Sequence, residues 1–242
     1  MNTTVKKNRI LSTLVIASMV SIVLLSGCKK DNASTPNASS VALKSSASFA
    51  VLAGSGITST GATTVNGDLG LSPGSSFGGF PPGILTGTLC INNMASTQAK
   101  LDLTAAYNEL AGRTSTDIVT LSGNLGGMTL SPGLYKSTSS IQISSGDLTL
   151  DAKGDANAVF IFQIASTLTT TSDRKVILSG GASAANVYWQ VGSSATFGST
   201  SVFKGNVLAL QSITFATGAT LDGRALACNG AIVMAGNTIV KP

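Results

Sequence analysis

The amino-acid sequence predicts an all-β solenoid, and a recurring strand pattern is the main reason. Thr196, Thr214 and Val233 occupy equivalent places in three copies of this pattern and stand 18 and 19 residues apart, while residues 56–61 form an earlier copy. Each copy alternates apolar residues with Thr or small residues, as a half-buried strand does. Short strands that repeat about every 20 residues are typical of a three-sided parallel β-helix, in which each coil pairs with its neighbours.

The N-terminus predicts export. A basic stretch within residues 1–9 precedes an apolar run over residues 10–25, which is too short for a good membrane-spanning helix. The run ends in Leu-Ser-Gly-Cys, which resembles the lipobox of bacterial lipoproteins and implies cleavage before Cys28 with lipidation of its thiol. Residues 1–27 are therefore predicted to be a lipoprotein signal peptide; an ordinary signal peptide with a chance cysteine is the alternative. We expect an exported protein, anchored by lipid in the outer membrane or at the cell surface, or released from it.

The rest of the chain divides into a tether and one domain. Residues 28–44 are polar and rich in Ser and Asn, which predicts a flexible tether, and residues 45–242 are long enough for one β-rich domain. The net charge of +5 is misleading, because from residue 45 onward nine Lys and Arg face nine Asp and Glu. A near-neutral domain without a basic stripe argues against nucleic acid as a partner.

One helix is expected, over residues 95–111. Its apolar residues recur at the helical spacing i, i+3, i+4, i+7, at Leu103, Ala106, Tyr107 and Leu110. Asn92 or Asn93 offers an N-cap and Gly112 a C-terminal stop. A helix of this length spans ~25 Å and could cover about five coils stacked ~4.8 Å apart.

The three sides of the solenoid differ in residue type. The first side is apolar in both alternating positions, which predicts a cover on its outer surface, and it comprises residues 160–163, 187–190, 207–210 and 225–227. We assign the helix to this side. The third side carries Asn, Lys and Asp outward, around residues 65–67, 178–180, 203–205 and 221–223, as an ordinary solvated face does.

The second side is the candidate functional face. Its inward positions are apolar and include Ile57, Met128, Ile141, Leu168, Ile213 and Ile232. Its outward positions follow from the period of two along a strand and are Thr58, Thr60, Thr129, Gln142, Thr169, Thr171, Thr196, Thr214, Ala216 and Val233. A regular, uncharged Thr array is a poor catalyst and a plausible surface for ordered water. The alternative is that Thr occurs here only because it is a good strand residue on a solvated face.

Other features are less specific. Residues 72–86 do not fit the repeat and are expected to form a loop or cap. Cys90 and Cys228 remain after processing in an oxidising compartment, so they form either a disulfide or two buried thiols. We expect no metal, no cofactor and a monomer.

Two other function classes compete with a water-ordering surface. Parallel β-helices host polysaccharide lyases, but the chain has no His, and its nearest acidic cluster, Asp147, Asp151 and Asp155, lacks the spacing of a calcium loop. We therefore expect no enzyme. A cell-surface adhesin for glycan or another surface fits a lipid tether equally well and is kept as the alternative function.

Several ordered blocks resemble the microbial ice-binding proteins of the DUF3494 family. They are residues 49–53, 66–70, 79–83, 105–107, 125–127, 132–135, 159–163 and 223–227, with Asn237. The resemblance spans roughly residues 45–242. It implies a discontinuous right-handed β-helix of triangular section with a long helix alongside, and an N-terminal coil that closes back beside the C-terminal coils, with Thr58 near Thr214 and Val233. It also implies an ice crystal surface as the partner, bound through one flat face, which we identify with the Thr-bearing side.

The chain departs from the most active members in one respect. Some of these carry a regular Thr-Ala/Gly-any-Thr/Asn motif on the ice-binding face, whereas the tetrads at 197–200, 215–218 and 234–237 lack the leading Thr. Gln142 and Val233 also interrupt the Thr column. We therefore expect ice binding that inhibits growth or recrystallisation of ice, with moderate thermal hysteresis.

Overall fold

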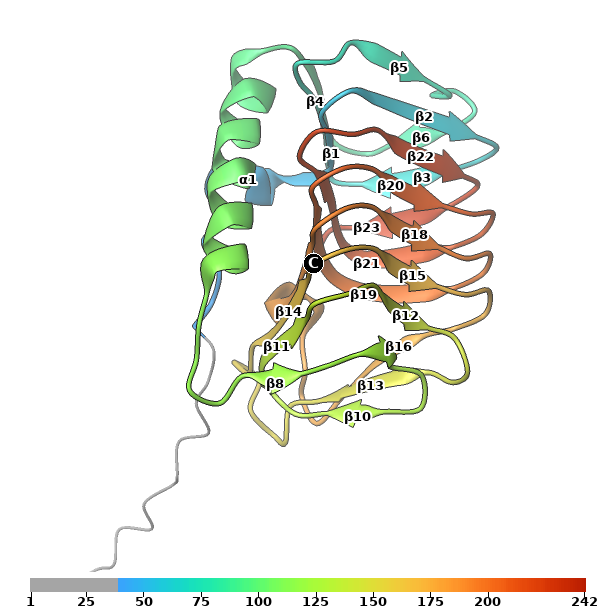
Figure 1. The fold of residues 1–242 in the computed structure, drawn as a ribbon. Helices are drawn as coiled ribbons and strands as arrows, with labels where there is room; N and C mark the ends of the chain where they lie inside the picture. Colours follow the sequence, from blue (N-terminus) through green and yellow to red (C-terminus); the bar gives the residue numbers. More distant parts are fainter. Residues whose placement is uncertain (1–38) are drawn as a thin grey trace, which may run out of the picture. The chain divides into compact units, whose positions relative to one another are not determined.

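The computed structural model describes residues 39–242, which form a coiled stack of parallel strands with one long helix beside it (Figure 1). The predicted signal peptide, Cys28 and the first part of the predicted tether lie outside the described residues. Every pairing between named strands is parallel. The predicted all-β solenoid with a single α-helix is confirmed for this part of the chain.

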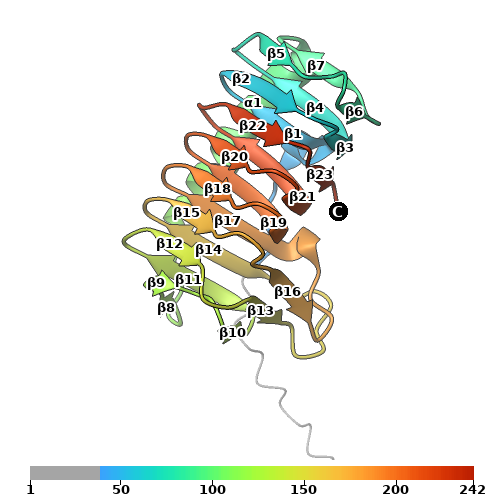
Figure 2. The same ribbon diagram turned by 90° about the vertical axis from the view of Figure 1, so that its right-hand side faces the viewer.

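One side of the coil is an eight-stranded sheet, called here the Thr-rich sheet (Figure 2). Its strands are, in spatial order, β5 (Ser76–Gly78), β2 (Gly56–Thr60), β22 (Ile232–Ala235), β20 (Ile213–Phe215), β18 (Ala195–Phe197), β15 (Leu168–Thr170), β12 (Ile141–Ile143) and β9 (Gly123–Asn124).

A twelve-stranded sheet covers the helix side and part of the third side. Its main path runs through β6 (Ile84–Leu85), β3 (Thr64–Asn66), β23 (Thr238–Val240), β21 (Thr220–Ala227), β19 (Val202–Ala209), β17 (Val187–Val191), β14 (Phe160–Ile164), β11 (Gly133–Ser137) and β8 (Val119–Thr120), with β1 (Phe49–Ala53), β4 (Asp68–Leu71) and β7 (Leu89–Ile91) branching from β21. A three-stranded sheet completes the third side with β10 (Thr129–Leu130), β13 (Leu148–Asp151) and β16 (Val176–Ser179).

The corner between the third side and the helix side lies within single strands. The first half of β21 pairs with β23 and its second half pairs with β1. Gly205 and Gly223 stand opposite each other at this corner with φ of +110° and +153°. A Cβ on Gly223 would lie 1.9 Å from the Gly205 carbonyl oxygen, so two neighbouring coils can turn here only with glycine.

The N-terminal coil lies between later coils, as the resemblance implied. β2 pairs with β22 on one side and with β5 on the other, and Thr58 stands opposite Val233. In Figure 1 the blue-green β2 lies next to the red β22. Segments from opposite ends of the described chain therefore build one continuous sheet. The segment 72–86, expected as a loop or cap, supplies β5 and β6, the terminal strands of two sheets.

The interior of the coil is filled by apolar side chains and a run of aromatic rings. Phe162 stacks on Trp189 with ring centroids 3.9 Å apart, and Phe197 stacks on Phe215 at 4.9 Å. Phe203 connects the two pairs, with its ring 5.0 Å from Trp189 and 4.5 Å from Phe197. These rings are fully buried, so they fix the backbone from which outward side chains project.

The helix α1 (Met94–Gly112) covers the helix side and exceeds the predicted range of 95–111 by one residue at each end. Asn93 caps it, because its side chain accepts from the Ser96 amide while the Ser96 hydroxyl accepts from the Asn93 amide. Its buried residues pack on the outer surface of the twelve-stranded sheet, against Leu52, Ile161, Tyr188, Leu208 and Leu226 among others. The expected cover on this side is confirmed.

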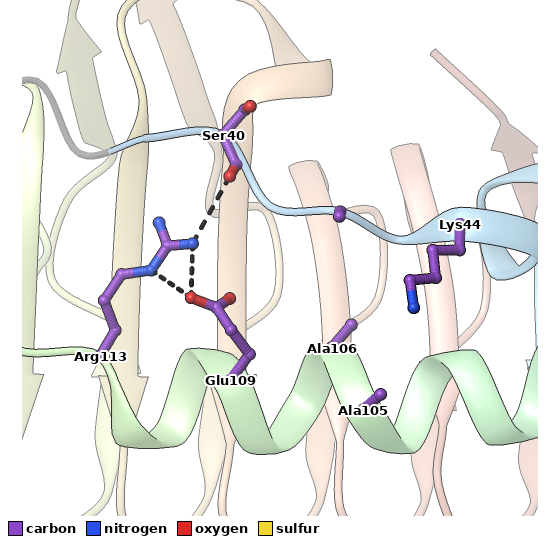
Figure 3. Close-up of a pocket in the computed structure, with 7 residues that line it drawn as sticks. Ser40, Lys44, Ala105, Ala106, Glu109 and Arg113 are labelled. Atoms are coloured by element: carbon purple, nitrogen blue, oxygen red, sulfur yellow. Dashed lines mark hydrogen bonds and ion pairs between the residues drawn. The ribbon is translucent and has the colours of Figure 1, made fainter.

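A short strap, residues 39–48, runs along α1 and ends in the 3₁₀ turn η1 (Lys44–Ser48). Val41 and Leu43 are buried in the cluster beneath the helix, so packing begins a few residues before the predicted domain start at residue 45. Arg113 pairs with Glu109 at 2.7 Å and donates to the Ser40 carbonyl (Figure 3). It also donates to the Ser39 carbonyl. A second 3₁₀ turn, η2 (Ala184–Asn186), precedes β17.

Cys90 and Cys228 are two buried free thiols. Cys90 lies on β7, and Cys228 directly follows β21. The sheet order β7, β4, β1, β21 puts three strand spacings between them, about 14 Å at ~4.8 Å each. Because disulfides need Cα atoms within about 7 Å, the disulfide alternative is wrong for this fold.

Candidate functional site

A single column of outward side chains crosses the whole Thr-rich sheet in register. Neighbouring members stand directly opposite one another on adjacent strands. From one end to the other the column reads Asn124, Gln142, Thr169, Thr196, Thr214, Val233, Thr58 and Gly78. The pairing places six of the ten predicted site residues in this central column.

A second column lies two residues further along the same strands, where side chains point outward again. Thr60 stands opposite Ala235 in this column, and Thr171 and Ala216 occupy the equivalent positions of the β15 and β20 coils. Three more predicted residues, Thr60, Thr171 and Ala216, therefore flank the central column. The other members are small, at Ser144, Gly198 and Ala235.

Thr129 does not belong to this face. It pairs with Thr149 in the three-stranded sheet of the third side, and Asn124 takes the expected place in the central column. Met128 is 37% exposed rather than inward. The chain makes two strands of only two residues here, β9 and β10, on either side of a turn at Gly126 and Gly127. Both β9 and β10 fit the alternation of the second side, and the prediction assigned the wrong one of them, β10, to that side.

Sequence reasoning also missed a third column, two residues before the central one. It carries hydroxyls at Ser140, Thr167, Ser194 and Ser212. The Thr167 hydroxyl donates to the Ser140 hydroxyl at 2.8 Å, and the Ser194 hydroxyl accepts from the Ser212 amide at 3.3 Å. The same period of two along each strand would have located these residues, had it been extended backward by one step.

The face is uncharged and rigidly supported. None of the residues in the three columns is Asp, Glu, Lys or Arg. Directly beneath them the inward residues Ile57, Leu168, Ala195, Ile213 and Ile232 are fully buried. Adjacent strands set equivalent outward groups ~4.8 Å apart, and groups two residues apart on one strand lie ~6.6 Å apart. The result is a two-dimensional lattice of methyls and hydroxyls.

Perturbed titratable groups lie elsewhere, mainly beneath the helix. Burial lowers the pKa of Lys100 to about 8, with the nearby Cys228 acting against this, and burial raises the pKa of Cys228 to about 11. The Lys100 ammonium donates to the Ala227 and Cys228 carbonyls at 2.5 Å each. Burial also raises the pKa of Tyr107 and Tyr188. These groups join the helix to the sheet and do not face the Thr-rich surface.

Among residues 39–242, no group of three or more His, Cys, Asp or Glu could hold a metal ion. Asp151 uses its carboxylate on its neighbour, accepting from the Lys153 amide and pairing with the Lys153 ammonium at 2.8 Å. Asp147 accepts from the Lys175 amide at 2.9 Å. In this same part of the chain, no helix combines the length and the apolar character needed to cross a membrane.

Comparison with known proteins gives one consistent result. The sequence profile of the ice-binding-like family matches residues 51–240. An ice-binding protein of Nostoc sp. (strain HG1) is 48% identical over 84% of this chain and 75% of its own length.

Solved structures agree with this match. The crystal structure of an ice-binding protein from an Antarctic biological consortium superposes with a TM-score of 0.84 at 65% identity, covering 85% of this chain and 93% of the other. That of an ice-binding protein from the Antarctic ascomycete Antarctomyces psychrotrophicus gives 0.80 at 42% identity, covering 84% and 98%. With its fold and nearly all of its described residues matched, this chain belongs to the ice-binding-like family.

Proposed function

We propose that this protein binds ice through the Thr-rich sheet and thereby inhibits the growth or recrystallisation of ice. The observation that carries the proposal is the unbroken register of the central column over eight strands. The matched relatives, which are named as ice-binding proteins, support the same function. The proposal assigns the chain no enzymatic activity.

The chemistry of Thr suits an ordered water surface. Its methyl group orders water weakly over itself, and its hydroxyl holds that water through hydrogen bonds. β-Branching restricts χ1, so the array loses little side-chain entropy when water becomes ordered on it. Each contact is weak, but the rigid backbone makes many contacts act together. Ice then grows as curved fronts between adsorbed molecules, which lowers the local freezing point.

We expect the thermal hysteresis of this array to be moderate. Gln142 is long and flexible, and Val233 lacks a hydroxyl although it is 41% exposed. These two residues interrupt the central column on either side of Thr169, Thr196 and Thr214. The regular lattice is therefore densest over three coils.

The test is the labelling of a growing single ice crystal by fluorescent full-length protein. The dye is attached on the helix side through Asn108→Cys, in a Cys28→Ser background so that it does not also couple to Cys28, while Cys90 and Cys228 are buried. Protein with the unchanged Thr-rich sheet is compared with Thr196→Tyr and Thr214→Tyr. We expect wild type to label ice and both variants to lose labelling, because a ring projecting from the face holds it off the lattice. Lys136→Tyr, at an exposed position near the helix, is the matched control and should label as wild type.

The outcomes separate the function from the site. Labelling that survives both Tyr variants would place the ice contact on another side. No labelling by wild type would reject ice binding and favour the adhesin alternative.

The lipid anchor at Cys28 remains a separate proposal, supported by the Leu-Ser-Gly-Cys sequence. We expect the protein to partition into membranes of cells that express it, and Cys28→Ser to release it. Metabolic labelling with a palmitate analogue tests this directly, and unlabelled wild-type protein would reject it. The predicted monomer is tested by light scattering.

A further inference from the structure

A cleft opens on the helix side, between the second half of α1 and the strands β11, β14 and β17. Its volume is about 340 Å³, which is within the range of small-molecule sites. None of the residues that line it belongs to the three columns of the Thr-rich sheet. Ice binding therefore leaves this cleft without an assigned role.

A row of long polar side chains forms one wall of the cleft. Strand register places Lys136, Gln163 and Gln190 directly opposite one another on adjacent strands, and this set is called here the polar row. The same row of positions continues into Leu208 and Leu226, which pack under α1. The outward residues therefore change from apolar to polar at the point where the cleft opens.

Gln163 carries an unused hydrogen-bond acceptor. The side chain is only 4% exposed, and its Nε2 donates to the Leu110 and Arg113 carbonyls at the end of α1. Because the amide is planar and its N–H groups face the helix end, Oε1 is turned away from that end. This oxygen is buried and accepts no hydrogen bond from any residue that the structure describes. A ligand that donates a hydrogen bond to it would remove an unfavourable buried polar group.

Lys136 supplies an unused donor beside this acceptor. It is exposed, and its ammonium takes part in none of the ion pairs formed within residues 39–242. It stands directly opposite Gln163, one strand spacing of ~4.8 Å away. A hydroxyl group both donates and accepts hydrogen bonds, so a ligand with neighbouring hydroxyls satisfies both side chains.

The rest of the cleft is small and mostly apolar. Ala111 of the helix and Ala165 and Gly192 of the sheet line it, and none of them has a side chain larger than a methyl group. They leave room for a flat ring to approach. A pyranose sugar has C–H groups on its ring faces and hydroxyls around its edge, so it matches an apolar surface next to a polar row.

We propose that this cleft binds a pyranose sugar, whose ring hydroxyls contact the polar row. The proposal does not depend on ice binding. The sugar comes either as a free monosaccharide or as a unit of a polysaccharide. Because the polar row faces outward on the helix side, the cleft can be occupied while the Thr-rich sheet lies against ice.

The test is a titration of ¹⁵N-labelled full-length protein, followed by NMR, with the methyl glycosides of glucose, galactose, mannose and N-acetylglucosamine. We expect at least one glycoside to shift the side-chain amide signals of Gln163 and Gln190 in a saturable way. Glycerol, which has hydroxyls but no ring, should leave them unshifted at the same concentration. If none of the glycosides shifts these signals, the cleft is not a sugar site.

The variant that tests the polar row is Lys136→Met. It removes the ammonium at an exposed position, so it should fold as wild type and raise the Kd of the glycoside about tenfold. Lys175→Met, at an exposed lysine of the third side, is the matched control and should keep the wild-type Kd. An equal Kd for Lys136→Met and wild type would overturn the assignment of the polar row.

A second variant tests the buried acceptor. Gln163→Met removes Oε1 together with the two bonds to the helix end, so circular dichroism melts must first show that it folds. Folded Gln163→Met should lose the glycoside response, and a wild-type titration would contradict the proposal.

Two further measurements separate the source of the sugar and the two functions. Retention of the protein on cellulose or agarose beads, released by the free glycoside, would identify a polysaccharide unit, whereas binding of the glycoside alone would identify a monosaccharide. Lys136→Met should label ice as wild type does. Wild-type protein that binds the glycoside but does not label ice would leave this site standing while the proposed function fails.

Discussion

The Thr-rich sheet and the part of the twelve-stranded sheet that lies under α1, called here the covered sheet, are made by the same coils and share one core. They differ in what lies against their outer surfaces. On the first, outward positions carry Thr, Ser and small residues. On the second, they carry Leu208, Leu226 and Ile161, which pack under α1. The outward residue therefore decides whether a parallel sheet is covered by protein or left to water.

Two buried glutamines show how closely the covered sheet is fitted to its helix. The Gln163 amide donates to the Leu110 and Arg113 carbonyls at 2.7 Å each, which satisfies the C-terminal end of α1. The Gln190 amide donates to the Tyr107 hydroxyl at 2.8 Å. The Thr hydroxyls of the central column, by contrast, make no hydrogen bond to any residue that the structure describes. Their substitution should therefore affect binding and not stability.

The largest expected effect comes from a change at the corner between the third side and the helix side, within β19 and β21. Gly223→Ala forces a Cβ against the Gly205 carbonyl, so we expect a loss of more than ~4 kcal/mol or failure to fold. Gly112→Ala is the control, because a Cβ there meets nothing within 4 Å. Urea unfolding measures both, and equal stabilities would show that the corner relaxes freely.

The covered sheet is tested by Leu103→Ala. Leu103 is fully buried under the helix, so we expect a loss of ~3 kcal/mol in the free energy of unfolding. Leu101→Ala, at a 62% exposed position of the same helix, should change it by less than ~0.5 kcal/mol. Ice labelling by folded Leu103→Ala protein should match wild type. Loss of labelling would mean that the helix shapes the Thr-rich face after all.

The buried Lys100 makes the free energy of unfolding depend on pH. Its pKa falls from 10.5 unfolded to about 8 folded, so between these values the unfolded chain holds more protons and stability rises with pH. Cys228 has the opposite effect: its pKa rises from 9 unfolded to about 11 folded, so between these values stability falls as the pH rises. From pH 7 to 9 we expect wild type to gain about 1 kcal/mol relative to Lys100→Met. Urea melts at both pH values measure this difference, and a constant difference would contradict it.

The smallest effect on stability is expected on the Thr-rich sheet itself. Val233→Thr restores a hydroxyl to the central column at a 41% exposed position, so unfolding should shift by less than ~0.5 kcal/mol while thermal hysteresis increases. Val119→Thr, exposed on β8, serves as the control and should leave hysteresis unchanged. An unchanged hysteresis in Val233→Thr would mean that the regularity of this column does not limit activity.

Strand alternation and helical spacing were sufficient to predict the solenoid, the helix and its side, because each depends on local periodicity. Nine of the ten predicted site residues lie in the central column or the one beside it for the same reason. The assignment of Thr129 was wrong because a strand of two residues is too short for its alternation to distinguish one side of the coil from the next. The separation of Cys90 from Cys228 depends on which strands become neighbours, and local periodicity does not encode that.

The insertion of β2 beside β22 has a consequence for how the protein is made. Thr58 leaves the ribosome long before its neighbour Val233, because most of the other coils lie between them in the sequence. Contacts between such distant segments form slowly, because a long loop must close first. A chain interrupted after residue 230 would lack β22 and β23, and would have a gap in the middle of its sheet, not at its edge. Only a chain translated through β22 can therefore present an unbroken Thr-rich face.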